Sequence, residues 1–246
     1  MTEVILRDLA GMAEFRLAEE LQNEVWGRDD TADPADLMMV IQAEGGLCAG
    51  AFAGERLIGY VFAFPTRDPG VQHSHRLAVL PEARGLHLGA RLKWYQRDWC
   101  LARGIRLVRW TYDPLRRINA GLNIAVLGAI ARVYYPDYYG VMQGINAGSP
   151  SDRLLAEWWL DSQRVQARSG VHASSPAAVS ERLVVPEDFD RLQAEAPVQA
   201  LAERLRVRAR LTTAFADGQA IVGFDRARGE YLLGPVPEEC ARSATT

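Results

Sequence analysis

The chain has 246 residues, of which 48% are hydrophobic, and its 28 basic and 31 acidic residues give a net charge of −3. This length suits one large domain, or one domain of about 150 residues with an extension, and the hydrophobic fraction is enough for a buried core. The charge balance argues against general nucleic-acid binding, which usually requires a strong basic excess.

Cysteine usage and hydropathy exclude further classes of protein. Cys48, Cys100 and Cys240 show no metal-binding spacing, and an odd number of cysteines makes a poor disulfide framework. The N-terminal residues lack the features of a signal peptide, and the longest weakly polar run, residues 118–131, is too short to span a bilayer. We therefore expect a cytoplasmic protein with reduced thiols, no bound metal, and no membrane or nucleic-acid partner.

The first part of the chain predicts helices followed by a meander of strands. Apolar residues that recur on one stripe indicate the helices, and turn signals separate the strands. The expected elements are helices over residues 11–26 and from Asp33 or Pro34 to Val40, then strands over 47–53, 57–64 and 73–80. Pro81 ends the last strand, because proline has no N–H to donate to the ladder.

Strands and helices then alternate, which predicts an α/β fold with a mixed sheet. The expected elements are a helix over residues 86–103, a strand over 106–112, a helix over 117–127, strands over 130–135 and 154–160, a helix over 186–211, and a hairpin of 219–224 and 230–233. Near residues 204–210 the alternating arginines could also indicate a strand. Residues 163–181 are rich in Ser, Ala and Gln, which is typical of a linker or surface excursion.

This order predicts a main domain over residues 1–165 and a C-terminal extension, a helix plus a hairpin, over residues 166–246. The extension is expected either to cover an edge of the sheet or to form the contact of a homodimer.

The turn after the strand 73–80 is the most informative segment. Residues Arg84 to Ala90 open a helix, whose first N–H groups have no internal partner and lie at the positive end of the helix dipole. Such a turn can cradle a pyrophosphate. The segment lacks both the dinucleotide-binding and the Walker glycine patterns. A glycine-containing turn without a ligand remains the alternative.

Residues 77–92, which read LAVLPEARGLHLGARL, resemble the cofactor motif of the GNAT N-acyltransferases. The resemblance covers roughly residues 1–165. It implies a mixed, mostly antiparallel central sheet flanked by helices. It also implies an enzyme that transfers an acyl group directly from an acyl-CoA co-substrate, such as acetyl-CoA, to an amine.

A narrower resemblance is to a bacterial subfamily of predicted GNAT acyltransferases found near N-acylamino acid racemases. The segments that carry it include Val25-Trp26-Gly27, His73-Ser74-His75, Gln96-Arg97-Asp98-Trp99, Trp110 to Leu115, Leu127-Gly128-Ala129, Tyr138-Tyr139-Gly140 and Ser151-Asp152-Arg153. This resemblance implies a small-molecule acceptor, an amino acid, and a succinyl donor (succinyl-CoA) as an alternative to acetyl.

Two positions depart from the family pattern. His87 stands where the motif usually has its middle glycine, and Ile124, beside Asn123, stands where these enzymes usually carry the tyrosine that protonates the leaving thiolate. These departures favour an alternative function, a coenzyme A-binding regulatory or interaction module with weakened catalysis.

The resemblance also implies roles for the cofactor residues. Backbone groups of Ala78 and Val79 would pair with the pantetheine arm like an added strand. N–H groups of the turn would hold the pyrophosphate, while Arg84 and Lys93 would supply positive charge or, alternatively, be solvated charges on the helix. The cofactor-binding candidates are Ala78, Val79, Arg84, Gly85, Leu86, His87, Leu88, Gly89, Ala90, Lys93, Asn119 and Asn123. Asn119 could instead be a simple helix cap.

Acyl transfer also requires groups that move protons. His75 precedes Val79 by four residues, so a regular strand would place both on one face, and His75 could accept the proton of the amine. Tyr138 and Asn123 are the further catalytic candidates, and Trp26 and Arg153 are candidates for binding the acceptor. The alternatives are a structural histidine, packed aromatic rings, and an ion pair of Arg153 with Asp152 or Asp113.

Overall fold

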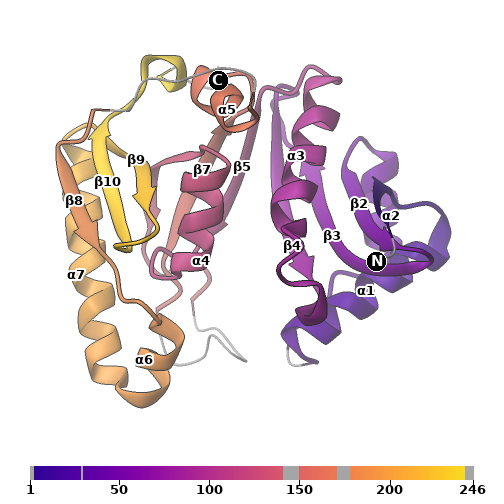
Figure 1. Ribbon diagram of the computed structural model, residues 1–246, viewed down its shortest axis with the longest axis horizontal. Coiled ribbons are helices and arrows are strands. Elements are labelled where there is room, and N and C mark those ends of the chain that lie inside the picture. The colour runs from indigo at the N-terminus through magenta and orange to yellow at the C-terminus, as the bar shows by residue number, and fades with distance from the viewer. Residues whose placement is uncertain (1–2, 29, 141–149, 171–177, 242–246) are drawn as a thin grey trace. The chain divides into compact units, whose positions relative to one another are not determined.

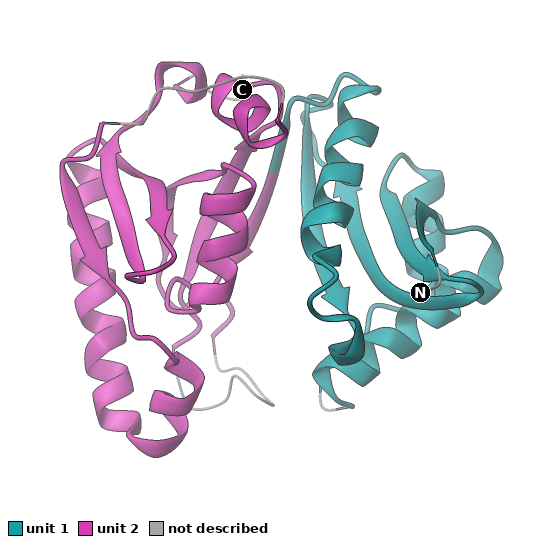
Figure 2. Ribbon diagram, viewed as in Figure 1, with its two compact units in different colours: residues 1–108, 143–145, 246 teal, residues 109–142, 146–245 magenta. Residues whose placement is uncertain are grey.

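The computed structural model describes residues 3–28, 30–140, 150–170 and 178–241. Among these residues, unit 1 comprises those up to residue 108 and unit 2 comprises those from residue 109 onward (Figure 2). The strand pairs β1–β2, β2–β3, β3–β4, β6–β7, β6–β9, β9–β10 and β8–β10 are antiparallel. The expected mixed α/β fold, with a mostly antiparallel sheet flanked by helices, is therefore confirmed.

Unit 1 contains four strands in the order β1-β2-β3-β4. Its elements are β1 (Val4–Asp8), α1 (Gly11–Trp26), α2 (Ala35–Ala43), β2 (Leu47–Ala53), β3 (Arg56–Pro65), β4 (Val71–Val79), the short 3-10 helix η1 (Pro81–Ala83) and α3 (Leu88–Leu101). Helix α3 packs against β2, β3 and β4 on one face of these strands, and α1 and α2 cover the other face (Figure 1).

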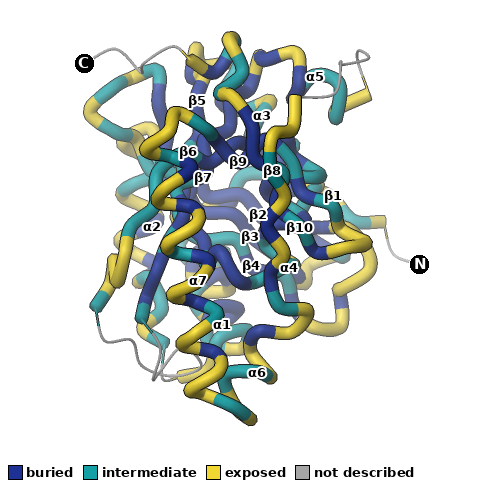
Figure 3. The backbone as a smooth tube through the Cα atoms, turned by 90° about the vertical axis from the view of Figure 1, so that its left-hand side faces the viewer, coloured by how far each residue is buried: buried dark blue, intermediate teal, exposed yellow. Residues whose placement is uncertain are grey.

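The core of unit 1 explains why its central strands are apolar along almost their whole length. Phe15 of α1, Met38 of α2, Tyr60 of β3 and Leu92 of α3 are all buried in one cluster. Helices cover both faces of β2 and β3, so successive residues of these strands are buried whichever way they point (Figure 3).

Unit 2 contains the strands in the order β5-β7-β6-β9-β10-β8. Its elements are β5 (Leu107–Tyr112, which begins at the end of unit 1), α4 (Arg117–Ala120), the π-helical segment η2 (Gly121–Val126), β6 (Ile130–Tyr135), β7 (Arg153–Trp159), α5 (Gln163–Arg168), β8 (Glu181–Val184), α6 (Phe189–Glu195), α7 (Pro197–Ala216), β9 (Gln219–Asp225), β10 (Glu230–Pro235) and the 3-10 helix η4 (Glu238–Cys240).

The C-terminal hairpin joins the same sheet as β6, since Ala131 of β6 is paired with Ile221 of β9. Helix α7 packs against β6 and β9 and buries Arg204, Val207 and Leu211. In this way the C-terminal segment continues the sheet of unit 2. The expected domain boundary at residue 165 and the expected homodimer contact stay predictions.

Most elements agree with the sequence analysis, and the differences have physical reasons. Strand β1 was missed because a five-residue edge strand has too short a pattern to stand out. The expected linker over 163–181 contains α5 and the start of β8, although residues 171–177 lie outside the described part. The expected helix over 186–211 is two helices, because Pro197 begins α7 and the residue before a proline is disfavoured in a helix. No helix in the described ranges is long and apolar enough to cross a membrane.

Candidate functional site

The turn between β4 and α3 is anchored at both ends and exposed in the middle. Leu80 and Ala83 are buried before it and Leu88 is buried after it, with 1 to 4% of their surface exposed. Arg84 and the next three residues, up to His87, are exposed. The buried ends fix the path of the backbone, while its centre remains accessible to a ligand.

His87 adopts a left-handed conformation, with φ 54° and ψ 27°. Gly85, two residues earlier, also has a positive φ of 93°. A left-handed residue with a side chain costs roughly 1 to 2 kcal/mol, and glycine avoids this cost. The geometry therefore explains the glycine that the motif usually has at position 87, and this chain keeps the same backbone turn with histidine.

Helix α3 begins with donors that have no partner in the helix. Arg91 is the first residue of the helix whose N–H donates to a backbone carbonyl, the oxygen of His87 at 3.0 Å. Within the described residues, the N–H groups of Leu88, Gly89 and Ala90 have no backbone acceptor. These donors lie at the positive end of a helix of 14 residues.

Lys93 lies one turn further along α3 and is buried. Its Nζ donates to Ser74 Oγ at 2.9 Å and to Gln96 Oε1 at 2.8 Å. Burial lowers the pKa of Lys93 to about 7, and the nearby Cys100 opposes this shift. The side chain therefore binds buried oxygens of β4 and α3, and its contacts give no support to the phosphate-binding role that the sequence suggested.

A β-bulge in β4 changes the expected placement of His75. Phe62 of β3 is paired with Arg76 and Ala63 with Ser74, so His75 is an extra residue without a partner opposite it. A bulge interrupts the alternation of side chains along a strand. The prediction that His75 shares a face with Val79 is therefore wrong.

The contacts of the two residues show the difference in face. Nε2 of His75 lies 3.3 Å from Oδ1 of Asp33, which precedes α2. Val79 lies beside Leu92 of α3, where both side chains border the space next to Gly59. His75 thus faces the side covered by α1 and α2, and Val79 faces α3. Ala78, between the bulge and the turn, is buried.

Trp26 lies in the same region of unit 1 as His75. The guanidinium of Arg76 is 4.8 Å from the centre of the Trp26 ring and forms ion pairs with Asp30 and Asp33, each at 3.1 Å. Asp33 therefore joins His75 and Arg76 in one cluster. Sequence reasoning missed this role for Asp33, because the residue was interpreted only as the start of a helix.

Asn119 and Asn123 belong to unit 2. Asn119 is in α4 and half-buried, whereas Asn123 is in the π-helical segment η2 and buried. Asn119 and Asn123 are four residues apart, which is about one turn of an α-helix. A π-helix has more residues per turn, so this spacing no longer corresponds to one regular turn. Ile124 is fully buried, so its side chain offers no proton donor at this position.

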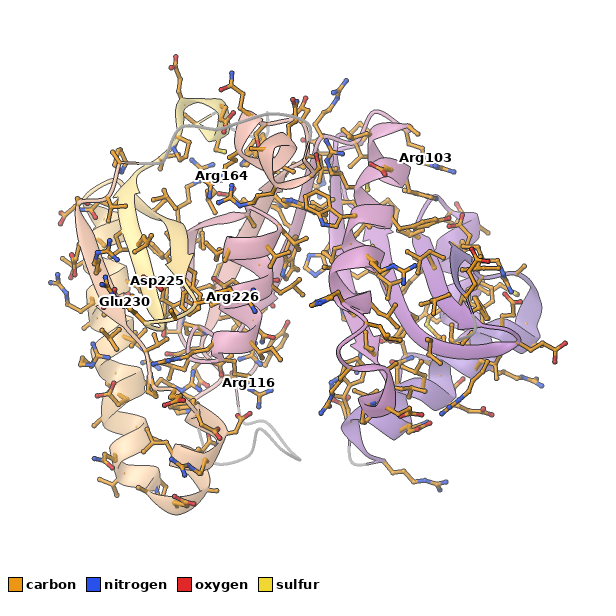
Figure 4. All side chains as sticks on the ribbon, in the orientation of Figure 1. Arg103, Arg116, Arg164, Asp225, Arg226 and Glu230 are labelled. Atoms are coloured by element: carbon orange, nitrogen blue, oxygen red, sulfur yellow. The ribbon has the colours of Figure 1, made fainter. Side chains whose placement is uncertain are left out.

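The carbonyls at the end of η2 are satisfied by side chains from β7 and α5. Trp158 Nε1 donates to Leu127 O at 2.8 Å, Arg164 Nε donates to Gly128 O at 2.7 Å, and Arg168 Nε donates to Ala125 O at 3.1 Å. Arg164 extends from α5 in Figure 4. Helix α5, in the expected linker, thus fixes the end of the segment that carries Asn123.

Tyr138 and Arg153 lie close to the same aromatic ring in unit 2. Tyr138 is half exposed and its ring centre is 4.8 Å from that of Tyr139. The guanidinium of Arg153 is 5.1 Å from the Tyr139 ring, and one of its nitrogens is 3.9 Å from Oδ2 of Asp113. Burial lowers the pKa of Arg153, with Asp113 opposing the shift.

The candidates therefore fall into two groups. Unit 1 holds Trp26, His75, Ala78, Val79 and the turn, and unit 2 holds Asn119, Asn123, Tyr138 and Arg153. In the described part of the chain, no group of three or more His, Cys, Asp or Glu residues could hold a metal ion.

Comparison with known proteins adds to this geometry. Residues 11–119 match the family model described as the acetyltransferase (GNAT) family. No curated protein matches the chain.

Several solved structures share the fold. The ribosomal-protein-S18-alanine N-acetyltransferase from Escherichia coli is 14% identical, with a TM-score of 0.54 over 65% of this chain and 96% of its own. A GNAT superfamily phosphinothricin acetyltransferase from Sinorhizobium meliloti, in complex with AcCoA, is 23% identical, with a TM-score of 0.51 over 64% and 88%. An N-acetyltransferase from Staphylococcus aureus Mu50 is 12% identical, with a TM-score of 0.55 over 65% and 99%. The chain therefore has the fold of the GNAT acetyltransferases, and its residues 11–119 match that acetyltransferase family.

Proposed function

We propose that this chain is an acyl-CoA-dependent N-acyltransferase that moves an acyl group from coenzyme A directly to a primary amine. The observation that carries the proposal is the turn from Arg84 to Ala90. It presents the free N–H groups of Leu88, Gly89 and Ala90 at the start of α3, in a segment that matches the GNAT acetyltransferase family.

The turn is suited to a pyrophosphate in charge as well as in shape. The helix start attracts anions, and Arg84 is exposed beside it. The nearby carboxylate of Glu82 is ion-paired with Arg56, which offsets its repulsion of an anion. Coenzyme A, when bound, would supply the activated acyl thioester, and the turn would hold its pyrophosphate.

The chemistry requires a polarised thioester carbonyl, a deprotonated amine and a proton for the leaving thiolate. In our proposal the N–H of Val79 polarises the carbonyl, His75 accepts the proton of the amine, and the hydroxyl of the half-exposed Tyr138 supplies the proton to sulfur. Trp26 and Arg153 would border the acceptor. Asn119 and Asn123 would contact the cofactor.

The proposed donor and acceptor rest on the comparison with solved structures and on the sequence. An acetyl donor is supported by the Sinorhizobium meliloti protein, which was solved with AcCoA. A succinyl donor and an amino acid acceptor rest on the narrower sequence resemblance. A small-molecule acceptor, a cytoplasmic location and a homodimer belong to the same proposal.

A second candidate is a coenzyme A-binding module without turnover. It is favoured by Ile124, which is fully buried where the related enzymes usually carry their tyrosine acid. The protein should be incubated with acetyl-CoA or succinyl-CoA and a panel of amines that includes amino acids, while release of free thiol is followed. Acceptor-dependent release supports the enzyme. Tight coenzyme A binding without turnover on any acceptor supports the module, and absence of binding removes both.

A further inference from the structure

Asp33 is held in place from its backbone and its side chain. Its N–H donates to Gln22 Oε1 at 2.9 Å, and its carbonyl accepts from Gln22 Nε2 at 3.3 Å. Gln22 is a buried residue of α1 with 1% of its surface exposed. The carboxylate oxygen Oδ2 lies 3.1 Å from Nε of Arg76. A carboxylate held at these points has little freedom to reorient.

The other carboxylate oxygen is directed at His75. Oδ1 of Asp33 lies 3.3 Å from Nε2 of His75. The imidazole is also braced by two rings of β3, since its centre is 5.8 Å from that of Phe62 and 5.6 Å from that of Phe64. The bulge turns His75 toward Asp33, and 37% of its side chain remains exposed.

We propose that Asp33 is a positioning residue for acyl transfer, which holds His75 with a proton on Nε2 and leaves Nδ1 free to accept the proton of the amine. This inference rests on the proposed function. A carboxylate that accepts from one ring nitrogen fixes the tautomer and orientation of the ring. As the bond between the amine nitrogen and the acyl carbon forms, Nδ1 takes the proton of the amine. The carboxylate of Asp33 stabilises the resulting imidazolium, the bond between the acyl carbon and sulfur breaks, and the thiolate leaves with a proton from Tyr138.

The charges around His75 suit this arrangement. Arg76, the next residue in β4, is a cation that forms ion pairs with Asp33 and Asp30, each 3.1 Å from a guanidinium nitrogen. His73 lies on the same side, with its ring centre 6.4 Å from that of His75. The two neighbouring rings of β3 are uncharged. Asp33 is therefore the carboxylate that contacts the imidazole directly.

Asp30 provides a matched control. It also carries a carboxylate at 3.1 Å from Arg76, but its described contacts do not include His75. The test compares Asp33→Asn, Asp33→Glu, Asp30→Asn and His75→Gln in the full-length protein. It measures kcat and KM for the best amine, together with thermal melting as a check of folding.

The expected loss for Asp33→Asn is about 10- to 100-fold in kcat, the range for removing a carboxylate that orients a histidine ligand. KM should change little, because Asp33 acts through His75 and not on the bound amine. Asp33→Glu should recover part of the activity, and Asp30→Asn should resemble the unchanged protein. Equal effects of Asp33→Asn and Asp30→Asn, or a loss that appears mainly in KM, would overturn the role.

NMR of the histidine ring separates this inference from the proposed function. The His75 resonances are identified by their absence in His75→Gln, and the 15N chemical shifts of the two ring nitrogens report which of them carries the proton in the neutral ring. Asp33→Asn should lower the share of the tautomer protonated at Nε2, while Asp30→Asn should leave that share in place. An unchanged share overturns the contact. A changed share in a protein that transfers no acyl group keeps the contact but overturns the positioning role together with the proposed function.

Discussion

The ammonium group of Lys93 is 2.9 Å from the hydroxyl of Ser74, in a pocket of neutral polar groups between α3 and β4. Gln96 joins the pair and is itself bonded through Nε2 to Oε1 of Gln72 at 2.7 Å. Lys93 is the one lysine of the chain, whose other basic residues are arginines. Burial disfavours the charged form of this lysine and lowers its pKa to about 7.

Lys93→Met is expected to remove a pH dependence of stability. The pKa of Lys93 is about 7 in the folded protein, against about 10.4 for an unfolded lysine. Between these values the unfolded chain binds more protons, so the lysine makes the free energy of unfolding rise with pH, by at most about 1.4 kcal/mol per unit. Below about pH 7 both states are charged and this contribution is lowest.

Urea denaturation at several pH values from about 6.5 to 9.5 measures this effect. The free energy of unfolding of the unchanged protein should rise with pH relative to that of Lys93→Met above about pH 7. The single lysine also allows a direct reading, because 13C-labelled lysine gives one side-chain resonance. A titration midpoint near 10 would contradict the burial argument.

Changes at His87 test the left-handed turn. His87→Gly is expected to leave stability unchanged or slightly higher, because the relief of strain is opposed by the greater freedom of glycine in the unfolded chain. His87→Val should destabilise the protein by more than 1 kcal/mol, roughly the cost of a β-branched residue at positive φ. Equal melting temperatures for both variants would show that the backbone at this position is not left-handed.

Gly89→Phe tests the placement of the pyrophosphate. A bulky side chain at the first turn of α3 should obstruct access to the free N–H groups and weaken coenzyme A binding about tenfold or more, which corresponds to about 1.4 kcal/mol. Ala102→Phe, an exposed substitution at the far end of the same helix, is the control. Calorimetric titration with coenzyme A gives both affinities, and an unchanged value for Gly89→Phe would contradict the proposed site.

Tyr138→Phe tests the proposed source of the proton for sulfur. Loss of a general acid typically costs about 100-fold or more in rate, so kcat should fall by that order while coenzyme A affinity remains. The neighbouring Tyr139→Phe should have a small effect on turnover, although it removes the hydroxyl bonded to Thr111 Oγ1 at 3.1 Å. Similar rates for the two variants would remove Tyr138 from the mechanism.

Arg164→Ala is expected to destabilise unit 2. Arg164 is buried and donates to Gly128 O at 2.7 Å and to Val222 O at 2.8 Å, so its removal leaves two buried carbonyls without these donors. The expected decrease in the free energy of unfolding is about 2 to 4 kcal/mol. Each unsatisfied carbonyl costs roughly 1 to 3 kcal/mol, and relaxation of the surrounding structure recovers part of the sum. Arg164→Lys should also be destabilised, because a single ammonium cannot reproduce the planar fork. Arg228→Ala, in the β9–β10 turn, is the exposed control for thermal melting.

The long regular elements and the cofactor turn could be predicted from the sequence. The apolar stripe of 11–26 and the turn signals around β2 and β3 gave the right elements, because in these segments local preference and burial agree. The motif from Leu77 to Leu92 indicated the fold through its resemblance to the cofactor motif of the GNAT family. These features depend on neighbours in the sequence.

The rest depends on distant contacts. Nothing near His75 in the sequence indicates a bulge, since the extra residue appears only in the register with Phe62 and Ala63. The burial of Lys93 depends on Ser74, 19 residues earlier. Arg164 could not be recognised as a cap for a helix that ends 38 residues before it.

The bulge also means that β4 carries one residue more than its pairing with β3 requires. Arg76 pairs with Phe62 and Ser74 with Ala63, so removing His75 alone would make these two pairs consecutive and restore strict alternation. Ser74 would keep its direction toward α3, and the ammonium group of Lys93 would keep its hydroxyl partner. The extra residue therefore adds an imidazole to the face covered by α1 and α2 while the opposite face of the strand stays as it is.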